Sequence, residues 1–507
     1  MRSTAILIGT EAAATQLELQ LGVLTGSADR PIVIGRVLVG PTSADSVGLG
    51  TLDELEAIVA RRKPAVALIS LPAAMSELLL SIRTRLRKLG IADRFMPTLE
   101  DQLAGVGPRT EIDVDLQRLI GRPPRSVDEG AIRAVVGGRT VLVTGAGGSI
   151  GSEICRIVAR YNPGKLVLVE RSENALFEID RQIARRFPTV QRRAALHDVV
   201  DAESTLALFR EEEPDIVFHA AAHKHVPMME DHPGLAVDNN LFGTKSTVDA
   251  AVAIGAERFV MVSTDKAVHP TSIMGSTKRL AELYVQHVNQ TSGTACSLVR
   301  FGNVLGSSGS VLETWKRQIA DGGPVTVTDP RMTRYFMSIP EAASLVIQAA
   351  ALTDRTAASG EVFVLNMGEP FRIVDLAKRF IEMHGLSPVF PEDHAPNHTH
   401  GRLGEIAVAY SGIRPGEKLY EELALDAETI RASRHPDIHI WGLPAPDAAS
   451  ITHMIDTLSP NRRSRDAARV AAIVRELVPE RPNAAAASQP TATANLSGTS
   501  SATAAAA

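Results

Sequence analysis

Short hydrophobic runs alternate with amphipathic stretches along this chain, a pattern that predicts alternating β-strands and α-helices. In residues 1–122 these runs indicate a small Rossmann-like α/β domain. Its expected elements are strands at 5–8, 32–34 and 65–69 and a helix at 52–59. The first loop of this domain, residues 9–15, has one glycine and an acid where a phosphate would lie. We therefore expect no nucleotide there.

A second set of apolar runs predicts the main α/β unit over residues 123–440. Its expected elements are strands at 140–144, 166–170, 216–218, 258–262 and 296–299 and a helix at about 278–289. Runs without polar alternation are typical of parallel strands covered on both faces. We expect an α/β fold with a Rossmann-type doubly wound parallel sheet and a C-terminal substrate-binding subdomain, preceded by the smaller domain.

Three further segments complete the predicted organisation. Residues 109–129 are polar and contain paired prolines, so we interpret them as a connector. Residues 441–479 are expected to form a helical extension. From residue 480 to 507 the chain is dominated by Ala, Ser, Thr and Pro, which bury too little apolar surface to order a tail.

A glycine-rich loop follows the strand expected at 140–144 and opens a helix at Ser149 and Ile150. Gly145 permits a tight turn, Gly148 lets the backbone approach a pyrophosphate, and Gly151 lets helix and strand pack closely. The phosphates would then meet the helix N-terminus. Such a loop alone is weak support, but here it lies between a buried strand and a helix, so we expect a dinucleotide site.

The residues after the next strand leave the choice of dinucleotide open. Glu170 can accept hydrogen bonds from ribose hydroxyls, which favours NAD, whereas Arg171 could meet the 2′-phosphate of NADP. The cofactor is therefore expected to be NAD or NADP. A spacing of the type Tyr-x-x-x-Lys at Tyr161 and Lys165 falls in the turn before that strand and is interpreted as a coincidence.

Composition excludes several classes of protein. The 507 residues are 44% hydrophobic and carry a formal charge of −5, so no basic footprint for nucleic acid is present. The two cysteines, Cys155 and Cys296, fit buried thiols of a reduced, cytoplasmic protein, and no His, Cys or Asp cluster has metal-ligand spacing. No uninterrupted apolar stretch reaches about 18 residues, so we expect no membrane span, and no signal peptide is expected because the N-terminus lacks the apolar h-region of one.

Two polar segments follow the strand expected at 258–262, namely Ser263-Thr-Asp-Lys266 and Met274-Gly-Ser-Thr-Lys278. Ligands of doubly wound sheets bind beyond the carboxyl ends of the strands. We therefore expect both segments to face a nicotinamide.

Together with other motifs, these segments resemble the extended short-chain dehydrogenase/reductase superfamily, and within it the nucleotide-sugar 4,6-dehydratases of bacterial polysaccharide biosynthesis. The matching stretches are 144–153, 219–227, 240–244, 263–268, 300–306, 333–337 and 414–418. Residues 4–122 also look like the domain that precedes the catalytic unit in long members of the family. Those members begin with membrane helices, which the present sequence does not show.

The resemblance implies UDP-N-acetylglucosamine as substrate and a redox-neutral reaction with a tightly bound, recycled NAD or NADP. Hydride leaves C4, water is eliminated across C5 and C6, and the hydride returns to C6. The family pattern assigns Asp265 as the acid near O6, Lys266 as the base near C5, and Thr264 as a hydrogen-bonding partner of O4. Lys278 is expected to hold the nicotinamide ribose. An acid role needs a raised pKa at Asp265 and a base role a lowered pKa at Lys266, and a simple ion pair would oppose both.

Met274 departs from the superfamily, whose tyrosine normally stands at this position. A thioether cannot take the O4 proton. Part of the dehydratase family also carries methionine there, so the substitution does not by itself indicate an inactive protein. Lys266 or a water held by Thr264 are the alternatives for the missing base.

Further residues are assigned by the same matched stretches. Asp198 resembles the residue that contacts adenine, Ala220 and Ala221 lie in the backbone segment that passes the cofactor, and Lys224 is expected to reach the sugar or its phosphate. His223 and His225 are interpreted as packing residues. The residues expected to line the UDP pocket are Asn303, Arg334, Arg414 and Glu417.

Three functions are therefore compatible with the sequence: a UDP-N-acetylhexosamine 4,6-dehydratase, a UDP-sugar epimerase or ketoreductase on the same fold, and a catalytically weak nucleotide-sugar sensor or scaffold. The adjacent acid and base at Asp265 and Lys266 favour the first, because an epimerase needs no acid at O6. Met274 is the main argument for the third. A homo-oligomer is expected by family resemblance alone.

Overall fold

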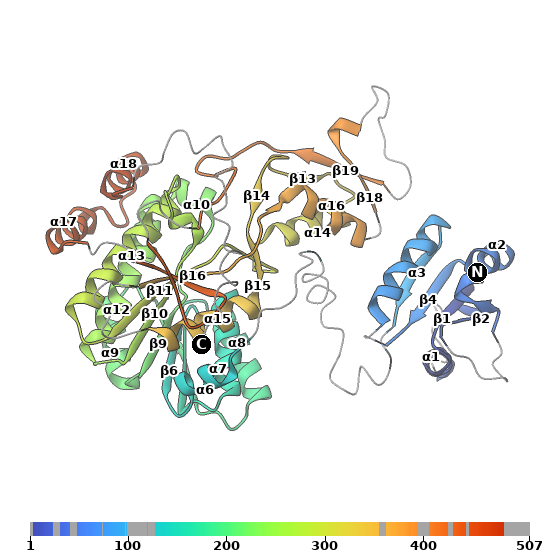
Figure 1. The fold of residues 1–507 in the computed structure, drawn as a ribbon, viewed down its shortest axis with the longest axis horizontal. Coiled ribbons are helices and arrows are strands. Elements are labelled where there is room, and N and C mark those ends of the chain that lie inside the picture. Colours follow the sequence, from blue (N-terminus) through green and yellow to red (C-terminus); the bar gives the residue numbers. More distant parts are fainter. Residues whose placement is uncertain are drawn as a thin grey trace, which may run out of the picture. The chain divides into compact units, whose positions relative to one another are not determined.

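A computed structural model describes residues 4–23, 31–40, 48–72, 75–96, 98, 119, 127–353, 361–384, 386–393, 405–423, 429–442 and 446–480. The chain forms two compact units (Figure 1). The first comprises Met1–Arg118, Phe380–Val389 and Ala395–Ile406, and the second comprises the remainder. The connector expected at 109–129 and the tail beyond residue 480 lie almost entirely outside the described residues.

A five-stranded sheet forms the centre of the N-terminal unit, in the order β3-β2-β1-β4-β5 with all neighbours parallel. Its strands are β1 (Thr4–Gly9), β2 (Ile32–Leu38), β3 (Gly50–Thr51), β4 (Val66–Ser70) and β5 (Ala92–Phe95). The helices are α1 (Glu11–Val23), the short η1 (Leu52–Glu54), α2 (Leu55–Arg62) and α3 (Ser76–Lys88). A Cβ at Gly9 would lie 2.3 Å from the carbonyl oxygen of Ser70, so a glycine is needed where the ends of β1 and β4 approach each other.

A nine-stranded sheet forms the centre of the second unit, in the order β20-β21-β16-β11-β10-β9-β6-β7-β8. The strands are β6 (Thr140–Thr144), β7 (Lys165–Glu170), β8 (Arg192–Leu196), β9 (Ile216–His219), β10 (Arg258–Val262), β11 (Ala295–Arg300), β16 (Glu361–Leu365), β20 (Thr429–Ala432) and β21 (Ile438–Gly442). The seven strands from β8 to β16 are parallel, and β21 and β20 are antiparallel additions. The strand order reverses between β6 and β9, which is where such sheets bind ligands.

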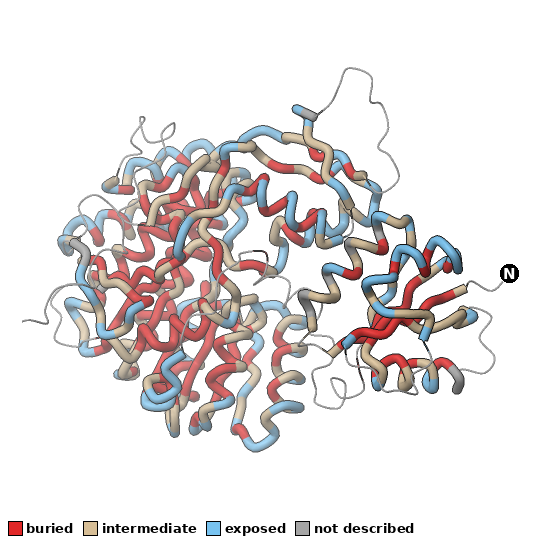
Figure 2. Tube along the Cα trace, turned by 45° about the vertical axis from the view of Figure 1, so that its right-hand side comes forward, coloured by how far each residue is buried: buried red, intermediate tan, exposed pale blue. Residues whose placement is uncertain are grey.

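Helices cover both faces of this sheet, and the buried sheet lies between more exposed helices (Figure 2). Alternate strand residues enter the two cores: Leu142 belongs to one and Val141 and Val143 to the other. One layer contains α6 (Glu129–Val136), α7 (Ser149–Arg160), α8 (Glu173–Arg186) and α15 (Ile339–Leu352). The other contains α9 (Ala202–Glu212), α12 (Gly243–Ala253) and α13 (Ile273–Thr291). The predicted α/β, Rossmann-type fold class is thus confirmed.

The remaining elements fall into two groups along the chain, one between β9 and β20 and one after β21. The first group is α10 (Val226–Asp231), α11 (Pro233–Ala236), η3 (Val237–Phe242), η4 (Asp265–Ala267), β12 (Asn303–Leu305), α14 (Val311–Ala320), β13 (Val325–Val327), β14 (Thr333–Arg334), β15 (Phe336–Ser338), β17 (Phe371–Arg372), α16 (Ile373–Met383), β18 (Ser387–Val389), η5 (Pro391–Asp393) and β19 (Glu405–Tyr410). The second is α17 (Ala448–Leu458), η6 (Ser459–Asn461) and α18 (Ala467–Leu477).

Glu480, which the sequence placed at the start of the tail, is held by the folded unit. Its carboxylate accepts hydrogen bonds from Arg279 Nη2 at 2.5 Å and from Arg279 Nε at 3.1 Å. Arg279 lies on α13 and is buried. The expectation that the chain has no contacts from residue 480 onward is therefore wrong for Glu480 itself, because composition does not reveal a single charged anchor.

Candidate active site

The glycine-rich loop turns from β6 into α7 as expected. Gly145 has φ +65°, in the left-handed region, and a Cβ there would lie 2.8 Å from Ala221 N. A Cβ at Gly151 would lie 2.1 Å from the carbonyl oxygen of Gly145, so helix and loop touch. At Gly148, the N-cap of α7, a Cβ would meet only that same carbonyl, at 3.2 Å. The loop therefore leaves an open approach to the first turn of a 12-residue helix, a suitable place for phosphates.

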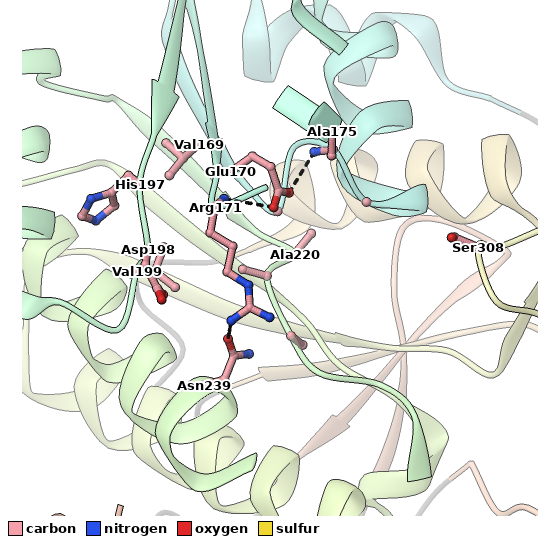
Figure 3. A pocket seen from close by; sticks show the side chains of 15 residues that line it. Val169, Glu170, Arg171, Ala175, His197, Asp198, Val199, Ala220, Asn239 and Ser308 are labelled. Carbon is pink, nitrogen blue, oxygen red and sulfur yellow. Dashed lines mark hydrogen bonds between the residues drawn. The ribbon is translucent and has the colours of Figure 1, made fainter. Parts of the chain in front are cut away.

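Beside this loop lies a cavity of about 280 Å³, which we call the adenosine cavity (Figure 3). Seven residues assigned to the cofactor line it: Gly145, Gly148, Glu170, Arg171, Asp198, Ala220 and Ala221. The Glu170 carboxylate accepts hydrogen bonds from the backbone N–H groups of Gly147 at 3.1 Å and Arg171 at 3.0 Å. Its orientation is thereby determined before any ligand binds.

Arg171 and Asp198 lie on the far wall of the adenosine cavity. The Arg171 guanidinium donates to Asn239 Oδ1 at 3.2 Å and lies 3.2 Å from His223 Nε2. Asp198 accepts from Val200 N at 3.2 Å, so it both caps the local turn and lines the cavity.

A larger cavity of about 530 Å³ begins at α7 and reaches the end of β10, and we call it the catalytic cavity. Its wall combines residues that the sequence assigned to cofactor, catalysis and substrate: Ser149, Ile150, Gly151, Ala220, Lys224, Thr264, Lys266, Met274, Lys278 and Asn303. These residues come from five different segments of the chain. Their convergence supports the view that the two polar segments after β10 face one site.

Met274 and Lys278 lie one turn apart on α13 and therefore share its cavity-facing side. The helix begins at Ile273 because Ser272 caps it, its hydroxyl accepting from Gly275 N at 3.1 Å. Lys278 Nζ donates to the carbonyl oxygen of Val262 at 2.8 Å. Burial lowers the pKa of Lys278 to about 8.

Asp265 and Lys266 form an ion pair at the end of β10. Lys266 Nζ lies 2.9 Å from Asp265 Oδ1, 2.9 Å from Asn303 Oδ1 and 3.8 Å from a carboxylate oxygen of Glu421. Burial alone would lower the pKa of Lys266, but the Asp265 and Glu421 carboxylates outweigh it and raise the pKa above its ordinary value. Lys266 is therefore an ammonium in this structure.

The Asp265 side chain is fully buried and lies behind the cavity wall. Its Oδ1 also accepts from the Thr264 hydroxyl at 2.9 Å, and Thr264 lines the cavity directly. Asp265 Oδ2 has no hydrogen-bond partner among the residues that the structure describes. Thr264 thus lies between the cavity and the acid, a relation that sequence order alone does not reveal.

A third cavity of about 230 Å³ adjoins the catalytic cavity, with which it shares Lys224, Lys266 and Asn303, and we call it the loop cavity. Its other walls include Arg334, Arg414, Glu417 and Glu421. Arg414 Nη2 lies 2.6 Å from Glu417 Oε1. The Arg414 side chain is exposed, whereas that of Glu417 is mostly buried. Arg334 is buried and donates to the backbone carbonyls of Lys418 and Leu419, so it holds the loop that carries Glu421.

Buried polar groups hold the frame of the site. His219 lies between two threonine hydroxyls, Thr144 at 2.8 Å and Thr244 at 2.9 Å, and burial lowers the pKa of His219 to about 3, so the ring is neutral. Asn240 binds both the N–H and the carbonyl of His223, at 2.8 and 3.1 Å. It sits in η3, a π-helical turn of the kind often found at functional sites. These contacts position the segment that carries Lys224.

Beneath the catalytic segment, the Glu282 carboxylate joins α13, β10 and β11. It accepts from Ser263 Oγ at 2.7 Å and from the Arg300 guanidinium at 2.7 and 2.8 Å. Burial would raise the pKa of Glu282, but Arg300 and Arg279 hold it at about 2, so the carboxylate is ionised. Ser263 directly precedes Thr264, so this network fixes the start of the catalytic segment.

Several lining residues were not assigned from the sequence: Gly147, His197, Asn239, Thr271, Ser308, Lys418 and Glu421. His225, expected to be a packing residue, also lines both the catalytic and the loop cavities. Glu421 follows the matched stretch 414–418 by three residues, and that proximity is the one signal that could have pointed to it. Tyr161 ends α7 at the opposite end of the strands, as its place in the motif order predicted.

No helix among the residues that the structure describes is long and apolar enough to cross a membrane. Within the same residues, no group of three or more His, Cys, Asp or Glu side chains could hold a metal ion. Cys155 and Cys296 are free, buried thiols, as expected.

A family model for polysaccharide biosynthesis proteins matches residues 141–442. The probable polysaccharide biosynthesis protein EpsC of Bacillus subtilis is 40% identical over 447 residues, 86% of this chain and 71% of that protein. A UDP-N-acetylglucosamine 4,6-dehydratase (inverting) of Campylobacter jejuni is 32% identical over 288 residues, 56% of this chain and 76% of that protein. The structure of Pen from Bacillus thuringiensis has a TM-score of 0.52 at 31% identity, covering 62% of this chain and 89% of that chain.

Proposed function

We propose, since this chain belongs to the family of polysaccharide biosynthesis proteins, that it is a UDP-N-acetylglucosamine 4,6-dehydratase. The observation that carries the proposal is the acid and base pair of Asp265 and Lys266, with Lys266 in the wall of a cavity that adjoins the glycine-rich loop and Asp265 directly behind that wall. The similarity to the Campylobacter jejuni dehydratase supports the same substrate and reaction. The product would be a UDP-4-keto-6-deoxy-N-acetylhexosamine.

The adenosine cavity suits a dinucleotide, with the α7 N-terminus for the phosphates and the preset Glu170 carboxylate for ribose hydroxyls. Glu170 favours NAD, because the Arg171 guanidinium is already engaged by Asn239 and is less available to a 2′-phosphate. When bound, the nicotinamide would accept hydride from C4 and return it to C6. Lys278, on the floor of the catalytic cavity, would hold its ribose.

Thr264 and Asp265 offer an answer to the absence of a tyrosine at position 274. The Thr264 hydroxyl faces the cavity and already donates to Asp265 Oδ1 at 2.9 Å. We infer that the O4 proton passes to Thr264 Oγ1 while the Thr264 proton passes to Asp265. Asp265 enters this step as the carboxylate of the ion pair, so the ionised pair is the competent resting form, and Asp265 leaves the step protonated and ready to serve as an acid.

The elimination then uses both members of the pair. Asp265 gives the acquired proton to O6 as water departs, and Lys266, after it has lost its own proton and become the neutral amine, takes the proton from C5, which the C4 ketone has made acidic. After hydride returns to C6, Lys266 gives its proton back to C5. The buried position of Asp265 requires Thr264 or a small rotation of the carboxylate to bring the proton to O6.

Incubation of the purified protein with UDP-N-acetylglucosamine, without added nicotinamide, tests the proposal. We expect a product about 18 daltons lighter than the substrate, the mass of one water. Asp265→Asn and Lys266→Ala should each lower turnover by about 10²-fold or more, with cofactor content unchanged. Interconversion of the 4-epimers without loss of mass would contradict the dehydratase and favour an epimerase.

A further inference from the structure

Glu421 is a buried carboxylate of the loop cavity that none of the steps above uses. Its side chain is 4% exposed, and one carboxylate oxygen, Oε1, lies 3.8 Å from Lys266 Nζ and 3.7 Å from Arg334 Nε. The other oxygen, Oε2, is buried and has no hydrogen-bond partner among the described residues. Burying a carboxylate oxygen without a hydrogen-bond partner lowers the stability of the fold, so the position of Glu421 beside the catalytic lysine calls for a reason.

The proton count of the proposed reaction supplies that reason. Lys266 is an ammonium in the resting site, yet it must be a neutral amine to take the C5 proton. Asp265 cannot accept the lysine's proton, because it has just received the one from O4. A third group must therefore hold one proton while elimination and reduction take place.

We propose, resting on the dehydratase function above, that Glu421 is this proton store. When Asp265 becomes protonated, Lys266 loses its closest negative neighbour, and its proton moves from Nζ to the Glu421 carboxylate. The gap of 3.8 Å exceeds a hydrogen bond, but catalytic contacts are often long in ligand-free sites and shorten when substrate binds.

With this store every proton is accounted for. The site begins with Asp265 and Glu421 ionised and Lys266 charged. The O4 proton goes to Asp265 and leaves with O6 as water, and the C5 proton goes to Lys266 and returns to C5. The proton held by Glu421 then returns to Lys266, so the resting charges are restored and one water is released per turnover.

Glu421→Gln is the decisive variant, because the amide keeps the shape of the side chain but cannot hold the proton. Oxidation at C4 should still occur, so reduced nicotinamide should accumulate on mixing with substrate, while dehydrated product forms about 10²-fold more slowly than in wild type. UDP affinity, measured by calorimetry, should change by less than about threefold. Glu422→Gln is the matched control, since Glu422 pairs with His269 at 2.6 Å and should leave both steps unchanged.

Glu421→Ala provides a second measurement, because formate can enter the space that the side chain leaves. We expect formate to restore dehydration at least tenfold in Glu421→Ala and not in Glu421→Gln. If wild type forms no dehydrated product, the proposed function itself is wrong. If wild type dehydrates and Glu421→Gln does so at more than a tenth of that rate, or formate restores nothing in a folded Glu421→Ala, only the proton store is wrong.

Discussion

Replacing Glu480 by Gln should destabilise the protein measurably, although this residue begins a segment of tail-like composition. The change removes the charge that pairs with Arg279, a buried side chain whose Nη2 and Nε contact Glu480 at 2.5 and 3.1 Å. Loss of one partner from a fully buried pair costs about 3–5 kcal/mol. Arg279 keeps a second partner, Glu282 at 3.1 Å, so we expect the smaller value for a charged hydrogen bond, about 1.5–3 kcal/mol.

The expected shift in melting temperature follows from the size of the folded unit. An unfolding entropy of about 2.1 cal/mol/K per residue over roughly 350 residues gives about 0.7 kcal/mol/K, so Tm should fall by about 2–4 °C. Calorimetry of the full chain measures this directly. Glu476→Gln on α18 is the control, because Glu476 is exposed, and its Tm should stay within about 1 °C of wild type.

A double variant tests whether the effect comes from the pair itself. With Arg279 replaced by Met, removal of the Glu480 charge should cost less than it does in wild type, because the interaction is already lost. A Glu480→Gln variant with the Tm of wild type would show that the contact of Glu480 with Arg279 adds no stability in solution. If Glu480→Gln lowers stability equally in wild type and in the Arg279→Met variant, the destabilisation does not come from the pair of Arg279 and Glu480.

Two further predictions concern the site. Arg414→Ala should weaken UDP binding about tenfold, or about 1.5 kcal/mol. This is the low end for charged hydrogen bonds, and we expect it because Arg414 is 59% exposed. An unchanged UDP affinity in calorimetry would place Arg414 outside the pocket. Met274→Tyr should speed transient nicotinamide reduction by up to about 10²-fold, because a phenolate near Lys278 adds a direct acceptor for the O4 proton. A folded, UDP-binding Met274→Tyr with unchanged reduction would refute this reasoning.

The strands of the main sheet were predictable because parallel strands covered on both faces read as uninterrupted apolar runs. The predicted strands at 140–144 and 258–262 coincide with β6 and β10. The expected end of β2 at residue 34 is wrong: the strand continues to Leu38, because Arg36 is accommodated by Glu18 on α1, with Nε at 2.7 Å from the carboxylate. Helix α13 begins five residues before its predicted start, since the Ser272 cap offsets the weak propensity of Gly275.

In the site, residues assigned from local motifs line the cavities, whereas several lining residues brought in by tertiary contacts were not assigned from the sequence. The glycine loop and the segment from Thr264 to Lys266 are contiguous in the sequence, and the structure brings them to adjoining cavities. Glu421 lies more than 150 residues from Lys266 along the chain, so no spacing rule relates them. Arg334 was expected to line the UDP pocket; it lines the loop cavity, and its guanidinium also donates to backbone carbonyls of the loop, a contact that side-chain type cannot reveal.

The methionine at position 274 and the charges around Lys266 have a common physical explanation. With a tyrosine, the O4 proton would have an acceptor of its own, and the acid and base could begin as a neutral pair. With a thioether, the proposed relay passes that proton into the acid and base pair itself, which requires Asp265 to begin as the carboxylate of its ion pair with Lys266. When the pair begins ionised, Lys266 carries a proton that it must lose before it can act as the base in elimination. Glu421, a nearby carboxylate with an unsatisfied oxygen, can hold that proton. Met274→Tyr should therefore make turnover less dependent on Glu421, so that the double variant Met274→Tyr with Glu421→Gln loses less activity than Glu421→Gln alone.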